Sequence, residues 1–514
     1  MIGDKRDLQS LPKNWIWVDL ESSCQKLTDG AHFSPKYVKE GYPFITISDV
    51  KGERIDFPSA KFVSKSDFEK LKENCNPRKG DVLFSKDGTV GKVIEINFEK
   101  EFIVLSSLAI LRPYPKLVTP SYLKFLLQSQ MVLNQCIRLK TGTALTRIIL
   151  RNLRTVKIPI PPLNEQQRIA VKVEELFSFL DAGVESLRKV QAQLKRYRQA
   201  VLKYAFEGKL TEEWRKTHKD QIEPAQVLFH KIKEERIRRG IGQWKKAETI
   251  AIKDLPEIPD DWIWVHAQEV CENITNGYTP SASELHNSNG EIPFIKINNL
   301  TFTGQLDLSK NKTFIDKKIH ETSLKRSKVF PGDVLINIVG PPLGKVSVVP
   351  NLYPEWNINQ AIVFFRPIEG YNRDFLALCL QTNSIISHLT NQAQATAGQF
   401  NISVNMSRNL LIPLPPKEEQ EKIVFEIRKH LNAIEQVAAT INESMSQSNH
   451  LRNSVLKAAF IGQLVPQDPD DEPAVKLLER IKAELIKSEV VVSSRLNDKK
   501  SKIDKQLELS RYVK

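Results

Sequence analysis

The sequence predicts an α+β protein in which two mixed α/β globular domains are joined by two long helices, with a pseudo-two-fold internal repeat. Three observations support this fold class. The chain of 514 residues contains one series of motifs twice, at an offset of about 250 residues. Each copy begins with short apolar runs between turn residues, and each ends with an apolar stripe at helical spacing. Because a solenoid unit has only about 20–50 residues, the repeat is a duplicated domain with its connector.

The repeated motifs keep the same order in both copies. The first is Leu-Pro-x-x-Trp or Ile-Pro-x-x-Trp, and a later one is Ile-Pro-x-Pro-Pro followed by Glu-Gln. The corresponding segments are 11–18 and 258–265, 43–47 and 293–297, 80–83 and 332–335, 158–166 and 412–420, and 201–208 and 455–462. A two-fold protein suits a partner with two similar half-sites, and duplex DNA is such a partner.

The first part of each copy predicts a mixed α/β globule. Residues 11–160 place apolar runs at 44–47, 81–84 and 102–105, which we interpret as strands because turn residues bound them. Thr119-Pro120 marks the start of a short helix over 121–127. Residues 258–415 repeat the pattern, including a helix over 374–380.

The second part of each copy predicts a long helix. Apolar residues recur every three or four positions from Ile169 to Tyr204 and from Ile423 to Val455. Each helix spans about 40 residues, or ~60 Å. Since a small domain cannot cover so long a stripe, we expect the two helices to pack against each other. Gly208 and Gly462 are expected to stop them, and further helical stretches follow over 224–239 and 473–487.

Composition favours an anionic partner in a reducing compartment. The net charge of +14 is spread along the chain, which indicates basic folded surfaces. The five cysteines form no C-x-x-C pair, and Cys24 and Cys271 occupy equivalent repeat positions, as expected of a small buried residue. We expect a cytoplasmic protein, because we find neither a signal core nor a run of 18 apolar residues.

The motifs argue against catalysis by this chain. An adenine methyltransferase loop needs Asn or Asp before Pro-Pro-aromatic, and Gly340-Pro341-Pro342-Leu343 lacks the required amide or carboxylate. The same segment, continued to Lys345, is one residue short of a P-loop and lacks its hydroxyl. The nine histidines are scattered without an H-E-x-x-H pair, so no metal site is predicted.

In combination, these motifs resemble the specificity (S) subunit of type I restriction–modification enzymes. The resemblance rests on Leu-Pro-x-x-Trp, Gly-Asp-Val-Leu, the Arg112-Pro113 and Arg366-Pro367 strand ends, and Ile-Pro-x-Pro-Pro with Glu-Gln before a long helix. Each motif is weak alone. Their order, their duplication and the attached helices make the combination specific, and it covers nearly the whole chain.

The resemblance implies a non-catalytic DNA-recognition protein. Each globular domain would be a target recognition domain that reads one half of a bipartite, asymmetric site in double-stranded DNA. The helices that begin near Glu165 and Glu419 would pair antiparallel as spacers and dock two methyltransferase (M) subunits. Restriction (R) subunits would complete the complex. S-adenosylmethionine, ATP and Mg²⁺ are expected on those partners and no cofactor on this chain, and no membrane is involved.

The resulting domain prediction has six parts. It comprises target recognition domain 1 over 1–163, spacer helix 1 over 164–208, a helical linker over 209–257, target recognition domain 2 over 258–416, spacer helix 2 over 417–462, and a C-terminal helix with a charged tail over 463–514.

Three pairs of segments are candidate DNA contacts, because basic, amide and hydroxyl side chains hold phosphates and read base edges. The candidates after the Gly-Asp-Val-Leu strand are Lys86, Thr89, Lys92 and Lys345; those of the polar segment before the last strand are Lys140, Thr143, Arg147, Gln399 and Asn401; those at a strand end are Thr46, Lys51, Lys296, Asn298 and Asn299. The alternatives are an ordinary hairpin turn, a polar loop and solvated strand ends, respectively. For the tryptophans near each domain start, core packing is favoured over base stacking.

Two rival functions remain. One is the specificity component of a related type II-like system with a fused methylase–nuclease. The other, of a different class, is a coiled-coil scaffold that does not bind DNA, although a scaffold would not need paired globular domains.

Overall fold

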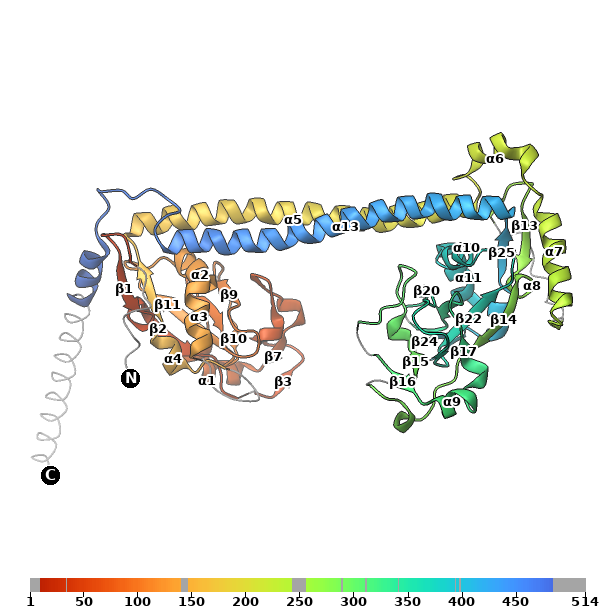
Figure 1. Cartoon of the computed structure of the whole chain (residues 1–514). Helices are drawn as coiled ribbons and strands as arrows, with labels where there is room; N and C mark the ends of the chain where they lie inside the picture. The colour runs from red at the N-terminus through yellow and green to blue at the C-terminus, as the bar shows by residue number, and fades with distance from the viewer. Residues whose placement is uncertain are drawn as a thin grey trace, which may run out of the picture. The chain divides into compact units, whose positions relative to one another are not determined.

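The chain, seen in a computed structural model, divides into two compact units (Figure 1). The structure describes residues 10–33, 35–139, 147–242, 256–287, 290–309, 312–340, 342–392, 394–396 and 399–483, with the main chain only for 392, 394–396 and 399–400. The first unit combines the chain up to Leu187 with the chain from Glu443 onward, whereas the second is the continuous segment Arg188–Asn442.

The globular domain of the first unit contains two four-stranded sheets and a two-stranded ribbon. The ribbon pairs β1 (Ile16–Asp19) with β12 (Lys157–Ile160). One sheet has the order β2 (Cys24–Asp29), β11 (Leu108–Pro113), β8 (Val82–Ser85) and β9 (Val93–Glu95); the other has β10 (Ile103–Val104), β4 (Tyr42–Ile45), β7 (Lys61–Val63) and β3 (Tyr37–Val38). The remaining elements are β5 (Val50–Lys51), β6 (Arg54–Ile55), α1 (Lys65–Cys75), α2 (Pro120–Gln128), α3 (Gln130–Arg138) and α4 (Leu150–Arg154).

The globular domain of the second unit repeats this plan. The ribbon pairs β13 (Ile263–His266) with β25 (Leu411–Leu414). One sheet has the order β14 (Cys271–Asn276), β22 (Ile362–Pro367), β18 (Val334–Asn337) and β20 (Val346–Val348); the other has β16 (Phe314–Ile315), β15 (Ile292–Ile295), β21 (Trp356–Ile358) and β17 (Lys328–Val329). The helices are α8 (Ala267–Val270), α9 (Lys317–Glu321), α10 (Arg373–Cys379), α11 (Asn383–Gln392) and α12 (Val404–Arg408). The predicted duplication is therefore confirmed in three dimensions.

Two 44-residue helices, α5 (Leu163–Phe206) and α13 (Lys417–Phe460), follow the domains. In each unit the beginning of one helix pairs with the end of the other, so the pairing is antiparallel. In the first unit Arg452 forms an ion pair with Asp181, and in the second unit Tyr197 Oη lies 3.0 Å from His430 Nδ1. Stripe residues at the helix starts, such as Ile169 and Ile423, are buried, but Val190 (39%), Tyr204 (55%), Val437 (43%) and Leu451 (53%) are exposed.

A buried Trp–Glu pair fixes each domain to the start of its helix. Trp15 Nε1 donates to Glu165 Oε2 over 2.9 Å, and Trp262 Nε1 donates to Glu419 Oε2 over 2.8 Å. Both tryptophans are at most 5% exposed, which confirms core packing for this pair, whereas Trp17 and Trp264 are half-buried. The glutamines that follow, Gln166 and Gln420, accept main-chain N–H bonds from Thr119 and Asn372, at the starts of α2 and α10. The repeated Glu-Gln motif is therefore the joint between domain and helix.

Glycines end both helices, and each packs against the other repeat. Gly208 and Gly462 have φ of +71° and +74°, the left-handed conformation that glycine adopts without steric cost. A Cβ at Gly208 would lie 2.3 Å from Pro259, and one at Gly462 would lie 2.4 Å from Pro12. The proline of each Pro-x-x-Trp motif thus contacts the glycine of the opposite copy.

The segments that follow the two long helices pack on the globular domains. In the second unit, α6 (Glu212–His218) and α7 (Ala225–Arg238) pack on the globular domain, where Arg236 donates to the carbonyl oxygen of Cys271. In the first unit, the Ala474 N–H donates to Asn14 O over 3.0 Å, and Arg168 pairs with Asp471 at 2.7 Å. The helical linker was predicted over 209–257, and in its described part, up to residue 242, Leu228 and Ile232 belong to the core of the second unit.

All five cysteines are buried, as predicted for Cys24 and Cys271, and they form no disulfide with one another. Burial raises the pKa of the Cys24 thiol to about 12, which disfavours the reactive thiolate. Among the described helices, none has the length and apolar composition of a membrane span.

Candidate nucleic-acid interface

Three segments predicted to contact DNA converge in the first unit. The hairpin between β8 and β9 carries the loop 86–92, in which Ser85 Oγ donates to Thr89 O (2.6 Å) and accepts from the Lys92 N–H (2.8 Å). Lys92 Nζ donates to Val50 O over 2.9 Å, which joins the loop to segment 46–51. The Ile148 N–H donates to Lys86 O over 2.9 Å, which brings Arg147 beside the same loop. We call residues 46–51, 86–92 and 147 the first loop surface.

The predicted residues of this surface differ in how they are used. Lys51, Thr89 and Arg147 are exposed and available to a ligand. Lys92 is half-buried, with its ammonium on a carbonyl oxygen. Thr46 caps a short helical turn, since its Oγ1 donates to Asp49 Oδ2 over 2.7 Å. Lys140 and Thr143 lie outside the described residues.

The role predicted for Lys86 requires correction. Its side chain is only 6% exposed, and its Nζ lies 3.3 Å from Asp29 Oδ1. Burial raises the pKa of Asp29, an effect that Lys86 opposes. A lysine held inside the domain by a carboxylate cannot also reach a phosphate, so Lys86 supports the loop from within.

The second unit brings together the equivalent segments. In the hairpin between β18 and β20, Asn337 replaces Ser85, and its Oδ1 accepts from the Lys345 N–H over 2.8 Å. The Ile402 N–H donates to Ile338 O, and the Val346 N–H donates to Thr301 O over 3.1 Å. The second loop surface comprises the described residues of 296–301, 338–345 and 399–401.

Asn298 and Asn401 are exposed on this surface, and Lys296 and Lys345 are partly exposed. The predicted contact at Asn299 requires correction, because the residue is 2% exposed. Its Oδ1 accepts from the Lys296 N–H at 2.9 Å and its Nδ2 donates to Asp307 O at 3.0 Å, so the amide shapes the turn. The side chain of Gln399 lies outside what the structure describes.

Two features of the surfaces are absent from the sequence interpretation. In the second unit β19 (Val339–Gly340), β24 (Gln399–Asn401) and β23 (Gln394–Thr396) form a small sheet. The polar segment before the last strand, for which a loop was the alternative, therefore contains two strands. In the first unit β5 and β6 form a hairpin that presents Arg54 beside Lys51. The Gly52 in its turn, with φ of +60°, was an available signal for this hairpin.

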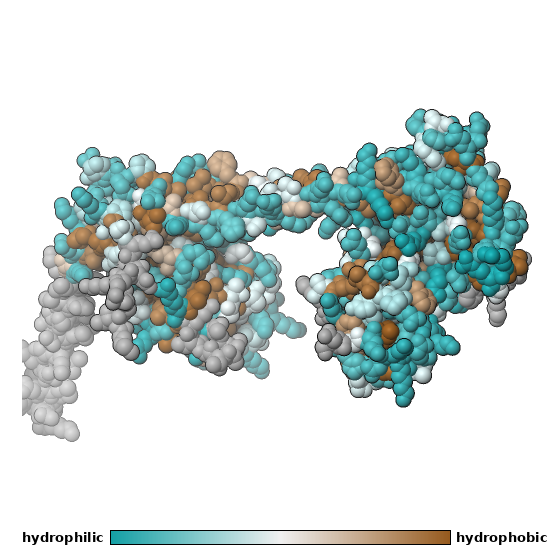
Figure 2. Space-filling view, in the orientation of Figure 1, coloured by the Kyte–Doolittle hydropathy of each residue, from teal (hydrophilic) through white to brown (hydrophobic). Residues whose placement is uncertain are grey.

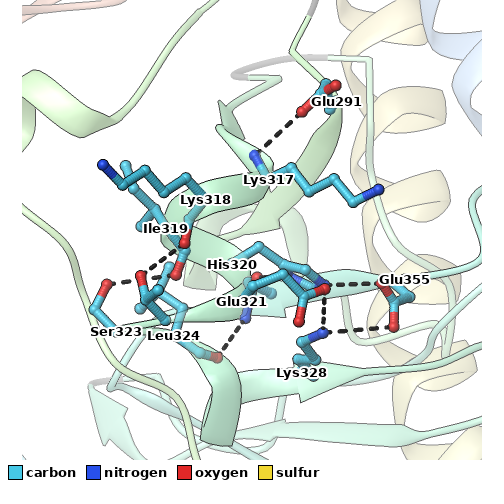
Figure 3. A network of polar contacts seen from close by, with 12 residues as sticks. Glu291, Lys317, Lys318, Ile319, His320, Glu321, Ser323, Leu324, Lys328 and Glu355 are labelled. Carbon is cyan, nitrogen blue, oxygen red and sulfur yellow. Dashed lines mark hydrogen bonds and ion pairs between the residues drawn. The ribbon is translucent and has the colours of Figure 1, made fainter.

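One group of side chains has the composition of a metal site. His320, Glu321 and Glu355 offer ligand atoms within 4.8 Å of one another (Figure 3). However, Lys328 Nζ lies 2.7 Å from Glu321 and 3.7 Å from Glu355, while His320 Nε2 lies 3.0 Å from Glu355. The ammonium already supplies the positive charge that a cation would bring, so the group is an internal ion-pair network.

An arginine–aspartate ion pair that is present in both domains has a structural role. Arg112 forms two 2.7 Å hydrogen bonds with Asp81, and Arg366 bonds the equivalent Asp333 at 2.8 and 2.7 Å. Burial raises the pKa of Asp333, and the guanidinium opposes this shift. Each pair ties the Gly-Asp-Val-Leu turn to the Arg-Pro strand end, which explains why both motifs repeat together.

The two domains share one framework, each with a polar loop surface and a joint to a long helix, so the chain is a duplicated module. The family model described as type I restriction modification DNA specificity domain matches residues 12–196 and 259–444. The chain therefore belongs to this family and is a specificity subunit with two copies of the domain.

Two curated relatives agree with this assignment, and a solved structure shares the fold. The chain is 26% identical over 497 residues to the type I restriction enzyme EcoKI specificity subunit of Escherichia coli K12, covering 92% of this chain and 96% of that one. It is 29% identical to the EcoBI specificity subunit of E. coli, over 65% of each chain. A solved structure on the "complex assembly and conformational transition of the type I R-M system" shares its fold, with a TM-score of 0.59, 21% identity, and coverage of 89% and 100%.

Proposed function

We propose that this chain is the DNA-reading component of a type I restriction–modification complex, and that each domain reads one half of a bipartite duplex site. The observation that carries the proposal is the duplication of a loop surface on an unchanged joint. The framework repeats at Trp15/Trp262 and Glu165/Glu419, whereas the loops differ in length and composition. One framework with two different loop surfaces fits an asymmetric target.

The accessible side chains are assigned as the contacts. Lys51, Arg54 and Arg147 would hold phosphates or guanine edges, and Thr89 would reach a base or the backbone. In the second domain the equivalent roles fall to Asn298, Lys345 and Asn401. Lys86, Lys92, Thr46 and Asn299 would instead hold the loops in shape.

The helices supply equivalent surfaces for two partner subunits. Val171 (67% exposed) of α5 corresponds to Phe425 (62%) of α13, and Tyr197 (47%) corresponds to Leu451 (53%). Each unit thus presents one exposed apolar residue of each pair, and apolar side chains gather along the helices in Figure 2. Because exposed apolar patches favour protein contacts, we assign these positions to two methyltransferase subunits.

In this proposal the chain binds and its partners react. Methyl transfer from S-adenosylmethionine and ATP-dependent steps with Mg²⁺ are assigned to the methyltransferase and restriction subunits. The five buried cysteines, which form no disulfide with one another, are compatible with the cytoplasm.

A gel shift with the reconstituted complex of this chain and its methyltransferase subunit tests the proposal. Methylome sequencing of cells that carry the system would first define the two half-sites and the spacer, and a duplex with that sequence is the probe. We expect specific binding that an unrelated duplex does not compete away. A complex that forms but binds no duplex at low salt would favour the coiled-coil scaffold. A partner that fuses methylase and nuclease in one chain would favour the type II-like system.

A further inference from the structure

The second unit contains a basic cleft away from its loop surface. The cleft has a volume of about 420 Å³ and lies between β14, β17, β22 and α12. Its lining consists of five cationic side chains, one aromatic ring and two neutral polar groups. These are Lys325, Arg326, Lys328, Arg366, Arg408, Phe330, Asn273 and Thr275. We call this the basic cleft.

The basic cleft and the second loop surface lie at opposite ends of the same sheet. Asn273 lies opposite Arg366 in the ladder, and Arg366 bonds Asp333, which directly precedes β18. The loop 338–345 begins after Asn337, at the other end of β18. The cleft lining therefore follows the first half of the strand, up to Thr275 at the level of Leu335, and no described residue of the loop 338–345 lines the cleft.

Two of the five cations are balanced by neighbouring carboxylates. Arg366 is paired with Asp333 at 2.7 Å, and Lys328 with Glu321 at 2.7 Å, the latter within the network drawn in Figure 3. Lys325 and Arg326 are exposed, and no carboxylate of the described residues forms an ion pair with either. Arg326 lies against the ring of Tyr278, with its guanidinium carbon 6.0 Å from the ring centre. The rim of the cleft therefore carries uncompensated positive charge.

In the first domain, the residues at the positions of Asn273 and Arg408 contact other groups of the same domain. Lys26 occupies the position of Asn273, since both lie opposite the repeated arginine, Arg112 or Arg366. Its Nζ donates to the Glu73 carbonyl of α1 over 2.6 Å. Arg154, the counterpart of Arg408, lies 3.4 Å from Glu21. The open cleft is thus a property of the second domain that the repeat alone does not require.

We propose that the basic cleft binds a phosphodiester of the DNA backbone outside the bases read by the loops, a site that rests on the proposed function. Lysine and arginine on the rim supply charge, and the Asn273 amide and Thr275 hydroxyl add the neutral donors typical of backbone contacts. Such a contact anchors the second domain on the duplex without reading sequence. An acidic protein surface is the competing ligand and is an outcome of the test.

The test compares two double variants in the full complex with the methyltransferase subunits. Lys325→Ala with Arg326→Ala removes the rim charge, whereas Lys317→Ala with Lys318→Ala removes two equally exposed charges of α9 that do not line the cleft. Binding is measured against salt concentration. We expect the slope of log K against log salt to fall by about one to two for the rim variant, as each lost phosphate contact contributes about 0.9. The control should retain the parental slope, and both should methylate the same sequence.

Trimmed duplexes locate the contact. When the duplex is shortened stepwise outside the second half-site, the salt slope of the parental complex should fall at one step, whereas the salt slope of the rim variant should not change. When the duplex is shortened outside the first half-site, the salt slopes of both complexes should change equally. Equal slopes for the parent and the rim variant, or equal losses in the rim variant and the control, would overturn the inference while leaving the proposed function intact. Loss of the methyltransferase subunit from the rim variant would assign the cleft to an acidic protein surface. A parental complex without DNA binding would defeat the proposed function itself.

Discussion

Replacing Glu419 by alanine should destabilise the second unit more than the equivalent change at Glu165 destabilises the first. Glu419 is fully buried and accepts hydrogen bonds from Trp262 Nε1 (2.8 Å), Thr211 Oγ1 (2.7 Å) and Arg215 Nε (2.9 Å). The variant leaves the Arg215 guanidinium, 14% exposed, without its carboxylate. Breaking such a buried ion pair costs about 3–5 kcal/mol.

Glu165 has a weaker set of partners. It accepts from Trp15 and Gln467, both neutral, and burial raises the pKa of its carboxyl, so that ionisation is already disfavoured in the folded protein. We expect Glu165→Ala to lower the free energy of unfolding by about 1–3 kcal/mol, because two neutral donors lose their acceptor and no buried cation loses its carboxylate.

Native-state hydrogen exchange measures both effects on the intact chain. A loss of about 3 kcal/mol raises opening more than 100-fold, since 1.4 kcal/mol is tenfold. Peptides around Thr211 and Trp262 should lose protection in Glu419→Ala, and Glu418→Ala, an exposed neighbour on the same turn, is the control. A loss of less than tenfold, or equal losses in the Glu419 and Glu165 variants, would refute the reasoning from buried partners.

Three further predictions concern the helices and the loop support. Inserting four residues after Leu187, with a matched insertion in α13, lengthens the helices by ~6 Å. The spacer between the half-sites, measured by methylome sequencing, should change by about one or two base pairs while the half-sites stay the same. An unchanged spacer would contradict a spacer role for the helices. Val171→Asp and Phe425→Asp should each weaken one methyltransferase site, so that the mass of the complex in light scattering falls by one subunit; full occupancy in the double variant would exclude this face. Lys86→Met should lower the free energy of unfolding at neutral pH by about 3 kcal/mol, because Asp29 loses its lysine partner. Urea unfolding measures this change. Because the folded-state pKa of Asp29 is raised, this loss should shrink as the pH falls through that value, and a pH-independent loss would contradict the assignment.

The parts of the fold predicted from sequence are those with local signals. The three- or four-residue spacing predicts helices that the structure bounds at 163–206 and 417–460. Thr119-Pro120 marks the start of α2, where the Thr119 side chain caps Tyr122. Such signals depend on a few neighbouring residues, so they survive without knowledge of the tertiary structure.

The parts that were missed depend on distant partners. Lys86 is exposed or buried according to Asp29, 57 positions away, and nothing in the local sequence indicates that pairing. The sheet formed by β19, β24 and β23 joins segments separated by about 60 residues. The Trp–Glu pairs were visible only as two repeated motifs, since 150 residues separate Trp15 from Glu165. The sequence therefore indicated which segments come together in each domain better than it indicated which side chains are exposed there, and contact of these segments with DNA stays a prediction.

The exchange of helix ends between units has a consequence for synthesis. The second unit is one continuous segment, 188–442, so its core can close as soon as that segment has left the ribosome. The core of the first unit needs Leu456, Phe460, Ala474 and Leu477, which are translated after the whole of the second unit. The domain that is made first is thus completed last, and at about 5–20 residues per second it waits tens of seconds with an apolar face uncovered. A chaperone or an early partner on the N-terminal domain would meet this need during translation.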